Sequence, residues 1–230
     1  MSTLGVRARG QEQMDSAELD AATYARVLGD LARVNRWTFT AAPTLRFLDR
    51  AAGGLGRFRL LDVGFGGGDM LRAIARWAQK RTIAADLVGV DLNPRSEAIA
   101  RATTPASMPI SFSTGDYRDI AGPFDFIVSS QVAHHMSDGE LDGFIRYMEE
   151  TARRGWLISD LHRHRFAHAG FPLLARIMGV HRIVREDGTL SIARSYRPGE
   201  WRDILERAGV TQGVGITRRF PFRLSVERIR

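Results

Sequence analysis

The sequence contains no cysteine, so disulfide bonds, thiolate metal sites and a cysteine nucleophile are all excluded. It also has no uninterrupted apolar stretch near the ~18 residues that a membrane-spanning helix requires. The N-terminal stretch MSTLGVRARGQEQMD lacks the apolar core of a secretory signal and is expected to form a short flexible tail. We therefore expect a cytoplasmic protein.

Lysine is nearly absent as well. Lys80 is the only lysine among 33 lysine and arginine side chains, and the formal net charge is +7. Clustered cations bind phosphate backbones, but these arginines are spread along the whole chain, which indicates a coding bias. We therefore expect no nucleic acid partner. With 230 residues, of which 44% are hydrophobic, the chain can bury one full core with an appendage.

Apolar segments bounded by turn residues alternate with helical patterns along most of the chain. Two amphipathic helices come first, and the segments that predict buried strands are 57–64, 86–92, 110–116, 124–130 and 154–161. Asp69 is expected to cap the helix after the first strand, and Pro94 to open the next helix. Strands that alternate with helices form a parallel sheet covered on both faces.

The last 20 residues depart from this alternation. A helix over 199–209 is followed by two extended segments that bend at Pro221, which predicts an antiparallel hairpin at a sheet edge. The predicted fold is therefore a Rossmann-like α/β fold. Its seven-stranded sheet is mostly parallel, carries an antiparallel C-terminal hairpin and has helices on both faces.

The first predicted strand runs into a glycine loop, LLDVGFGGGDM, residues 60–70. A dinucleotide fingerprint needs glycine at its first, third and sixth positions, and here Gly64 and Gly66 fit but Asp69 takes the sixth. A carboxylate opposes pyrophosphate at a helix N-terminus, and no phosphate-loop lysine follows. Asp62 and Asp69 favour a ligand with positive charge, such as S-adenosylmethionine, over a loop that is only a structural turn.

The stretch LLDVGFGGGD resembles motif I of the class I S-adenosylmethionine-dependent methyltransferases. That motif has an acidic residue followed by alternating glycines, and Asp62, Gly64, Gly66 and Gly68 meet it. The resemblance implies that the glycines pass the methionine part of the cofactor. It also implies that Asp62 binds the amino group of the cofactor, directly or through water.

Three further stretches, VGVDLNP, STGDY and FDFIVSSQVAHH, are similar to later elements of the same family and occur in the family's order. The resemblance implies that Asp91 accepts hydrogen bonds from both ribose hydroxyls. It places Asp116 at the adenine amino group and Tyr117 beside the ring. Leu92 and Ser130 belong to the same implied site. The cofactor would be S-adenosylmethionine and the product S-adenosylhomocysteine.

Two adjacent histidines follow the fourth predicted strand, where the exit loop faces both cofactor and acceptor. Either His134 or His135 is a candidate general base or hydrogen-bond partner, because neutral imidazole with a pKa of about 6.5 can accept a phenolic proton. The alternative is that the pair only packs or orients the loop. His162, His164 and His168 lack nearby carboxylates at ligand spacing beyond one aspartate and are interleaved with arginine. We therefore expect a solvated basic face there and no metal site.

The segment RFAHAGFPLLARIMG carries bulky apolar residues and predicts an amphipathic helix broken near Pro172. Together with the N-terminal helices it would cover a pocket for an aromatic or lipid-like acceptor, or else pack on the core as such helices usually do. We accordingly divide the chain into an N-terminal tail and helical lid, 1–56, and a methyltransferase domain, 57–230. An insert at about 162–198 contributes to the acceptor pocket.

Two stretches, SDLHRHR and SYRPGEWRDILERAG, resemble bacterial small-molecule methyltransferases of quinone biosynthesis and of polyketide phenols. The resemblance implies O-methylation of a phenolic, polyketide-derived or quinone-precursor hydroxyl. C-methylation of a quinone-type ring and a catalytically inactive S-adenosylmethionine-binding regulator are the alternatives, with nucleic acid methylation a third. Arginines beside the insert fit either peripheral contact with an anionic membrane or the coding bias.

Overall fold

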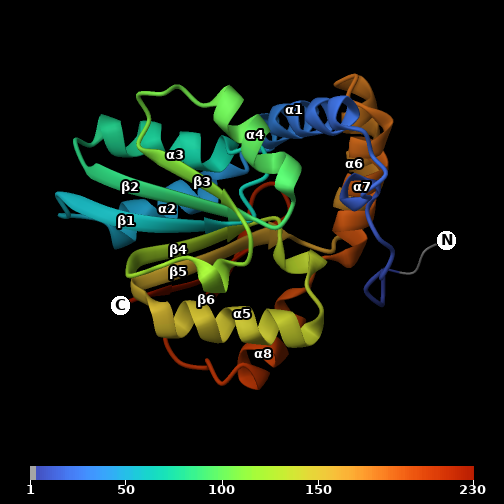
Figure 1. Cartoon of the computed structure of the whole chain (residues 1–230). Helices are drawn as coiled ribbons and strands as arrows, with labels where there is room; N and C mark the ends of the chain where they lie inside the picture. The colour runs from blue at the N-terminus through green and yellow to red at the C-terminus, as the bar shows by residue number, and fades with distance from the viewer. Residues whose placement is uncertain (1–3) are drawn as a thin grey trace.

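A seven-stranded sheet forms the centre of the structure, with strand order β3-β2-β1-β4-β5-β7-β6. In this computed structural model, which describes residues 4–230, the first five strands pair in parallel and β7 pairs antiparallel with β5 and β6 (Figure 1). The predicted sheet and its C-terminal hairpin are confirmed. The strands are β1 (Arg57–Val63), β2 (Ala84–Asp91), β3 (Ile110–Thr114), β4 (Phe124–Ser130), β5 (Ala152–Leu161), β6 (Val214–Arg219) and β7 (Arg223–Ile229).

Helices cover both faces of this sheet and also its carboxyl edge (Figure 1). One face carries α2 (Ala41–Ala51), α3 (Asp69–Lys80) and α4 (Pro94–Thr103), and the other carries α5 (Asp138–Thr151) and α8 (Pro198–Arg207). Beyond the carboxyl ends of the strands lie α1 (Ala21–Trp37), α6 (Arg165–Ile177) and α7 (Arg182–Arg194). Short 3-10 helices are η1 (Gln13–Asp15), η2 (Tyr117–Asp119) and η3 (Ala133–His135).

Alternate residues of the central strands enter two separate cores. Leu60 and Phe126 face α2 and α3, where Phe126 meets the Phe47 ring edge-on at 5.9 Å. Leu61 and Ile127 face α5 and α8. Because successive side chains of a strand point to opposite faces, an unbroken apolar run fits a strand buried on both sides. Each large side chain in these cores stabilises the fold by about 1.5–3 kcal/mol.

A third apolar cluster joins α1 to α6 and α7. Helix α6 continues through Pro172, so the predicted break there is wrong. Phe171 and Ala175 hold it on its neighbours, and Gly188 of α7 leaves room for the Phe171 ring, which would lie 2.3 Å from a Cβ at that position. Helix α7 was not predicted because Asp187 and Ser191 occupy its buried face and interrupt the apolar periodicity.

The N-terminal segment, residues 4–20, lies along α7, so the expectation of a flexible tail is wrong for it. The backbone amides of Gln13 and Met14 each donate to the Asp187 carboxylate at 2.9 Å, and the amide of Ala8 donates to the carbonyl of Ala193 at 3.1 Å. These buried polar partners hold a segment that has few apolar residues of its own. Residues 1–3 lie outside the described structure.

The histidine and arginine stretch after β5 is only partly a solvated face. Burial and the nearby positive charges lower the pKa of His162 to about 4. Arg163 is buried, donates to the carbonyl of Ser195 at 2.9 Å and pairs with Glu200 of α8. The expectation of a solvated basic face is therefore wrong for these two residues, and the Arg163 side chain joins the insert to α8.

Candidate functional site

A cavity of about 730 Å³ lies between the carboxyl ends of β1, β2 and β4 and the three helices α1, α6 and α7. In an open α/β sheet ligands bind at this edge, where the strand order reverses, and here β1 lies between β2 and β4. The volume is typical of a pocket that holds a small molecule or cofactor. Every residue that the sequence assigned to the cofactor, except Gly68, lines it, and so do both candidate histidines.

The glycine loop brings bare backbone to the cavity. Gly64, Gly66 and Gly68 all have positive φ, at +80°, +52° and +74°, which glycine adopts without strain. A Cβ on Gly64 would lie 2.3 Å from the side chain of Val132, so that position also has no space for a larger residue. The sequence predicted that Asp69 caps α3, and this prediction is wrong, because Gly68 is the N-cap residue. The Asp69 carboxylate accepts from the Asn35 amide of α1 at 3.1 Å instead.

Asp62 is buried, and its carboxyl forms no ion pair with any residue that the structure describes. Burial, together with the charges of Asp69 and Asp91, raises the pKa of Asp62 to about 8. Its Oδ2 atom has no hydrogen-bond partner among residues 4–230. Three carboxyls on one wall of a cavity, one of them unpaired, fit a ligand that carries positive charge.

Asp91 ends β2 and points into the loop. Its Oδ2 accepts from the amide of Gly66 and its Oδ1 from the amide of Asn93, both at 2.8 Å. Burial raises the pKa of Asp91, and these two amides oppose the shift. Each carboxylate oxygen has two lone pairs, so both retain one for a hydroxyl donor from a ligand. Leu92, at the rim beside it, is 77% exposed.

The wall after β3 is more open. Asp116 pairs with Arg118 at 2.5 Å, and this hydrogen bond lowers the pKa of Asp116. The Tyr117 ring packs against Phe144 and Tyr147, with centroids 4.9 and 4.7 Å away, so it is a fixed apolar wall.

On the neighbouring wall the Ser130 hydroxyl, at the end of β4, is buried. Within the described part of the chain it has no hydrogen-bond partner.

His134 is buried and held by carboxylates on both sides. Its Nδ1 lies 2.7 Å from Asp160 of β5, and its Nε2 lies 3.5 Å from Glu12. Burial by itself lowers the pKa of His134, but the charges of Asp160 and Glu12 outweigh it and raise the pKa to about 9. In the ligand-free protein His134 is therefore an imidazolium at neutral pH.

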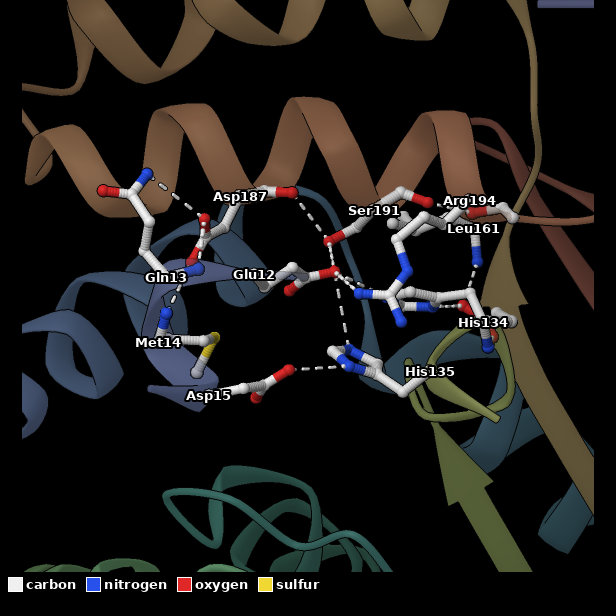
Figure 2. A network of polar contacts seen from close by, with 12 residues as sticks. Glu12, Gln13, Met14, Asp15, His134, His135, Leu161, Asp187, Ser191 and Arg194 are labelled. Atoms are coloured by element: carbon white, nitrogen blue, oxygen red, sulfur yellow. Dashed lines mark hydrogen bonds and ion pairs between the residues drawn. The ribbon is translucent and has the colours of Figure 1, made fainter. Parts of the chain in front are cut away.

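His135 faces the cavity, and 29% of its side chain is exposed. Its Nδ1 lies 3.2 Å from Asp15, and its Nε2 lies 3.6 Å from Glu12. Figure 2 shows Glu12 between the two histidines on one side and α7 on the other, where Ser191 donates to it at 2.8 Å. Sequence reasoning missed Glu12 and Asp15, which only the packing of the N-terminal segment brings here. Asp160 could have been found from its place at the carboxyl end of β5.

Comparison with known proteins shows that the sequence around this site is similar to methyltransferases. Residues 60–155 match a family model described as a methyltransferase domain. Over these residues the chain therefore carries a methyltransferase domain. A ubiquinone biosynthesis O-methyltransferase of Cereibacter sphaeroides is 29% identical over 160 residues, which cover 66% of this chain and 60% of the relative. A protein of the same name from Acinetobacter baumannii is 25% identical over 180 residues, which cover 73% and 69%.

The methyltransferase fold is shared with solved structures. The magnesium protoporphyrin IX methyltransferase of Synechocystis, crystallised with S-adenosylhomocysteine, has a TM-score of 0.57. It is 20% identical, with 94% of this chain and 90% of the other covered. The matched residues of the methyltransferase domain include the glycine loop and both histidines. Glu12, Asp15 and the insert lie outside them. Within the described structure no helix combines the length and apolar composition needed to cross a bilayer.

Proposed function

We propose that this protein transfers a methyl group from S-adenosylmethionine to a small aromatic acceptor, by O-methylation of a phenolic, polyketide-derived or quinone-precursor hydroxyl. The observation that carries the proposal is the unpaired buried carboxyl of Asp62 beside bare glycine backbone. The two ubiquinone biosynthesis O-methyltransferases to which the chain is similar support O-methylation of a quinone-related acceptor. The chain spans about 60% of the length of the first of them.

The cofactor end of the cavity would be the wall formed by β1, β2 and β3. Asp62 and the loop glycines would hold the methionine part, and Asp91 the ribose hydroxyls. The adenine amino group would lie near Asp116, with Tyr117 beside the ring and Leu92 and Ser130 completing the wall. When bound, S-adenosylmethionine supplies a methyl group whose carbon a nucleophile can attack in line with the carbon–sulfur bond, with S-adenosylhomocysteine as the leaving group.

The acceptor end would be the wall formed by the insert and the N-terminal segment. Phe166, Phe171 and Leu174 of α6 line it, together with Met14 and Met136. An aromatic ring fits such a surface because apolar and thioether side chains adapt to its shape. The histidine and carboxylate group of Glu12 and His135 lies at the same end and supplies the polar contact. By holding the acceptor oxygen in line with the methyl carbon, these walls would supply most of the catalytic effect.

We assign the contact with the acceptor hydroxyl to His135, because His134 is buried and already charged. Asp15 would orient His135 through Nδ1 and leave Nε2 toward the cavity. That nitrogen would take a hydrogen bond or a proton from a phenol, whose pKa is about 10. Asp160 and His134 would position the loop that carries His135.

The first test is calorimetric binding of S-adenosylmethionine, S-adenosylhomocysteine and NAD to the purified protein. We expect the first two to bind and NAD to give no heat, since the Asp69 position opposes a pyrophosphate. A screen of phenols and quinone precursors with the methyl donor follows, with products identified by NMR. Binding of NAD alone would contradict the proposal. Tight binding of the donor without turnover on any acceptor would favour the inactive regulator, and carbon-bound methyl products would favour C-methylation.

Replacing His135 with alanine is expected to lower turnover by about 10²–10⁴-fold, which is the usual contribution of a positioned acid or base. The affinity for S-adenosylhomocysteine should stay unchanged, because His135 lies at the acceptor end. His168→Ala, on α6 and outside the cavity lining, is the matched control. Full activity of the His135 variant would remove this histidine from the chemistry.

The membrane contact expected from the sequence stays a prediction, and so does the absence of a nucleic acid partner. Helix α6 exposes Phe166, Leu173 and Ile177, with 60%, 62% and 76% of each accessible to solvent. Phe166 also lines the cavity. These side chains supply the apolar surface that such a contact would require. The division into a lid over 1–56 and a domain over 57–230 with an insert is likewise proposed.

A further inference from the structure

We propose that Glu12, His134 and His135 form a binding site for one divalent transition-metal ion, such as Zn²⁺, at the acceptor end of the cavity. One ligand atom from each of the three lies within 4.8 Å of the other two. Two imidazole nitrogens and one carboxylate oxygen are a common ligand set for such ions, with positions left open for a substrate. Glu12 directly precedes η1, and both histidines lie in η3.

The distances suit a single ion. The Nε2 atoms of His134 and His135 lie 3.5 and 3.6 Å from the same carboxylate oxygen of Glu12. Two ligand atoms that each bind Zn²⁺ at about 2.1 Å, at a tetrahedral angle, are about 3.4 Å apart. The ligand atoms therefore already have the spacing of a coordination sphere.

Each histidine is oriented as in a metal site. Asp160 lies 2.7 Å from Nδ1 of His134, and Asp15 lies 3.2 Å from Nδ1 of His135. A carboxylate can only accept, so each Nδ1 carries the proton and each Nε2 is the nitrogen left for a ligand. This carboxylate, histidine and metal arrangement recurs at zinc sites because it fixes the ring and raises its basicity. Asp160 and Asp15 are thus positioning residues.

The buried nitrogen of this group is without a hydrogen-bond partner. Nε2 of His134, on a side chain only 1% exposed, makes no hydrogen bond with any described residue and points at the Glu12 carboxylate. A lone pair that faces a carboxylate is repelled unless a positive charge lies between them, and either a proton or a metal ion supplies it.

The surrounding charge also favours a cation. Asp15 and Asp187 lie near Glu12. The opposing charges are Arg7, which donates to the carbonyl of His134 at 3.3 Å, and Arg194, at 3.4 Å from Glu12 Oε1. Ser191 donates to the same oxygen from α7 and fixes the carboxylate toward the histidines. If the function proposed above is right, a bound ion would occupy Nε2 of His135 and take over its contact with the acceptor hydroxyl. The open positions of the ion would then bind the acceptor oxygen, and an acceptor with two adjacent oxygens would chelate it.

The test uses full-length protein without a histidine tag, stripped with a chelator and titrated with Co²⁺, Zn²⁺ or Mg²⁺ alone. We expect the protein to bind one Co²⁺ per chain and to show the visible absorption bands of Co²⁺ with nitrogen and oxygen ligands. Adding Zn²⁺ should abolish these bands, and adding Mg²⁺ should not. Glu12→Gln and His135→Gln should each weaken Co²⁺ binding by at least ~10–100-fold, and Asp15→Asn by an effect within that range. His168→Gln, a partly exposed histidine outside the group, should leave binding unchanged.

Three outcomes would overturn the site: no uptake by the stripped protein, equal uptake by Glu12→Gln, or equal loss in His168→Gln. Circular dichroism confirms that each variant is folded before titration. Calorimetry with S-adenosylhomocysteine on the same samples separates the two proposals. Protein that binds the nucleoside but no Co²⁺ refutes the metal site alone. Protein that binds Co²⁺ but not the nucleoside refutes the donor site alone.

Discussion

Replacing Asp91 with alanine is expected to weaken S-adenosylhomocysteine binding by about 10²–10⁴-fold. A hydrogen bond to a charged group contributes about 1.5–3 kcal/mol, and two ribose hydroxyls would donate to this carboxylate. The substitution also removes the acceptor for the amides of Gly66 and Asn93, which loosens the loop that passes the methionine part. Calorimetry on the purified variant measures the change.

Asp86→Ala is the matched control, since Asp86 lies on the same strand and makes a half-exposed ion pair with Arg59 at 3.0 Å. Its effect on nucleoside affinity should be negligible because exposed ion pairs contribute little and this one is remote from the cavity. Asp116→Asn should have a small effect, since its open position already pairs it with Arg118. An Asp91 variant that binds as well as the unaltered protein would refute the ribose assignment.

Replacing His134 with alanine is expected to lower the free energy of unfolding by about 3–5 kcal/mol, because Asp160 is left as a buried charge without its partner. For a chain of this size that corresponds to a fall in melting temperature of about 6–20 °C. His135→Ala, whose ion pair with Asp15 is partly exposed, should cost less than ~1 kcal/mol. Thermal unfolding of both variants measures the contrast.

The His134 effect should depend on pH. Its folded pKa, about 9, is above the unfolded value of about 6.5, so protonated His134 stabilises the fold fully below pH 6.5. That contribution is lost as the pH rises through 9. The difference in melting temperature between the unaltered protein and His134→Ala should therefore shrink from pH 6.5 to pH 9. Equal melting temperatures at neutral pH would show that the buried pair does not stabilise the protein.

The sheet, and the wall of the cavity that we propose for the methyl donor, could be predicted from the sequence because their signals are local. Each central strand is a short apolar run that ends in a polar or glycine residue, and Asp62, the glycines and Asp91 follow directly from those ends. The positive φ at position 64, which favours glycine, is also a property of a few consecutive residues.

The opposite wall, which we propose for the acceptor, could not be predicted because it depends on packing between distant segments. Glu12 lies in a stretch without periodicity, and its place is set by amides that bind Asp187 of α7. Helix α7 was not predicted either, because polar residues on its buried face interrupt the apolar periodicity. The proline rule also failed in α6, since contacts of Phe171 with α7 outweigh one lost backbone hydrogen bond.

If Glu12 and Asp15 act as proposed, the N-terminal segment that lies on α7 couples access to the cavity with the chemistry inside it. Glu12 and Asp15 reach the cavity only while that segment stays in place, and they also form part of its wall. Releasing the segment to admit an acceptor would remove both carboxylates from the histidines in the same movement. The protein would then have a closed form with its full set of polar groups and an open form that lacks them, so water entering the open form would meet an incomplete site.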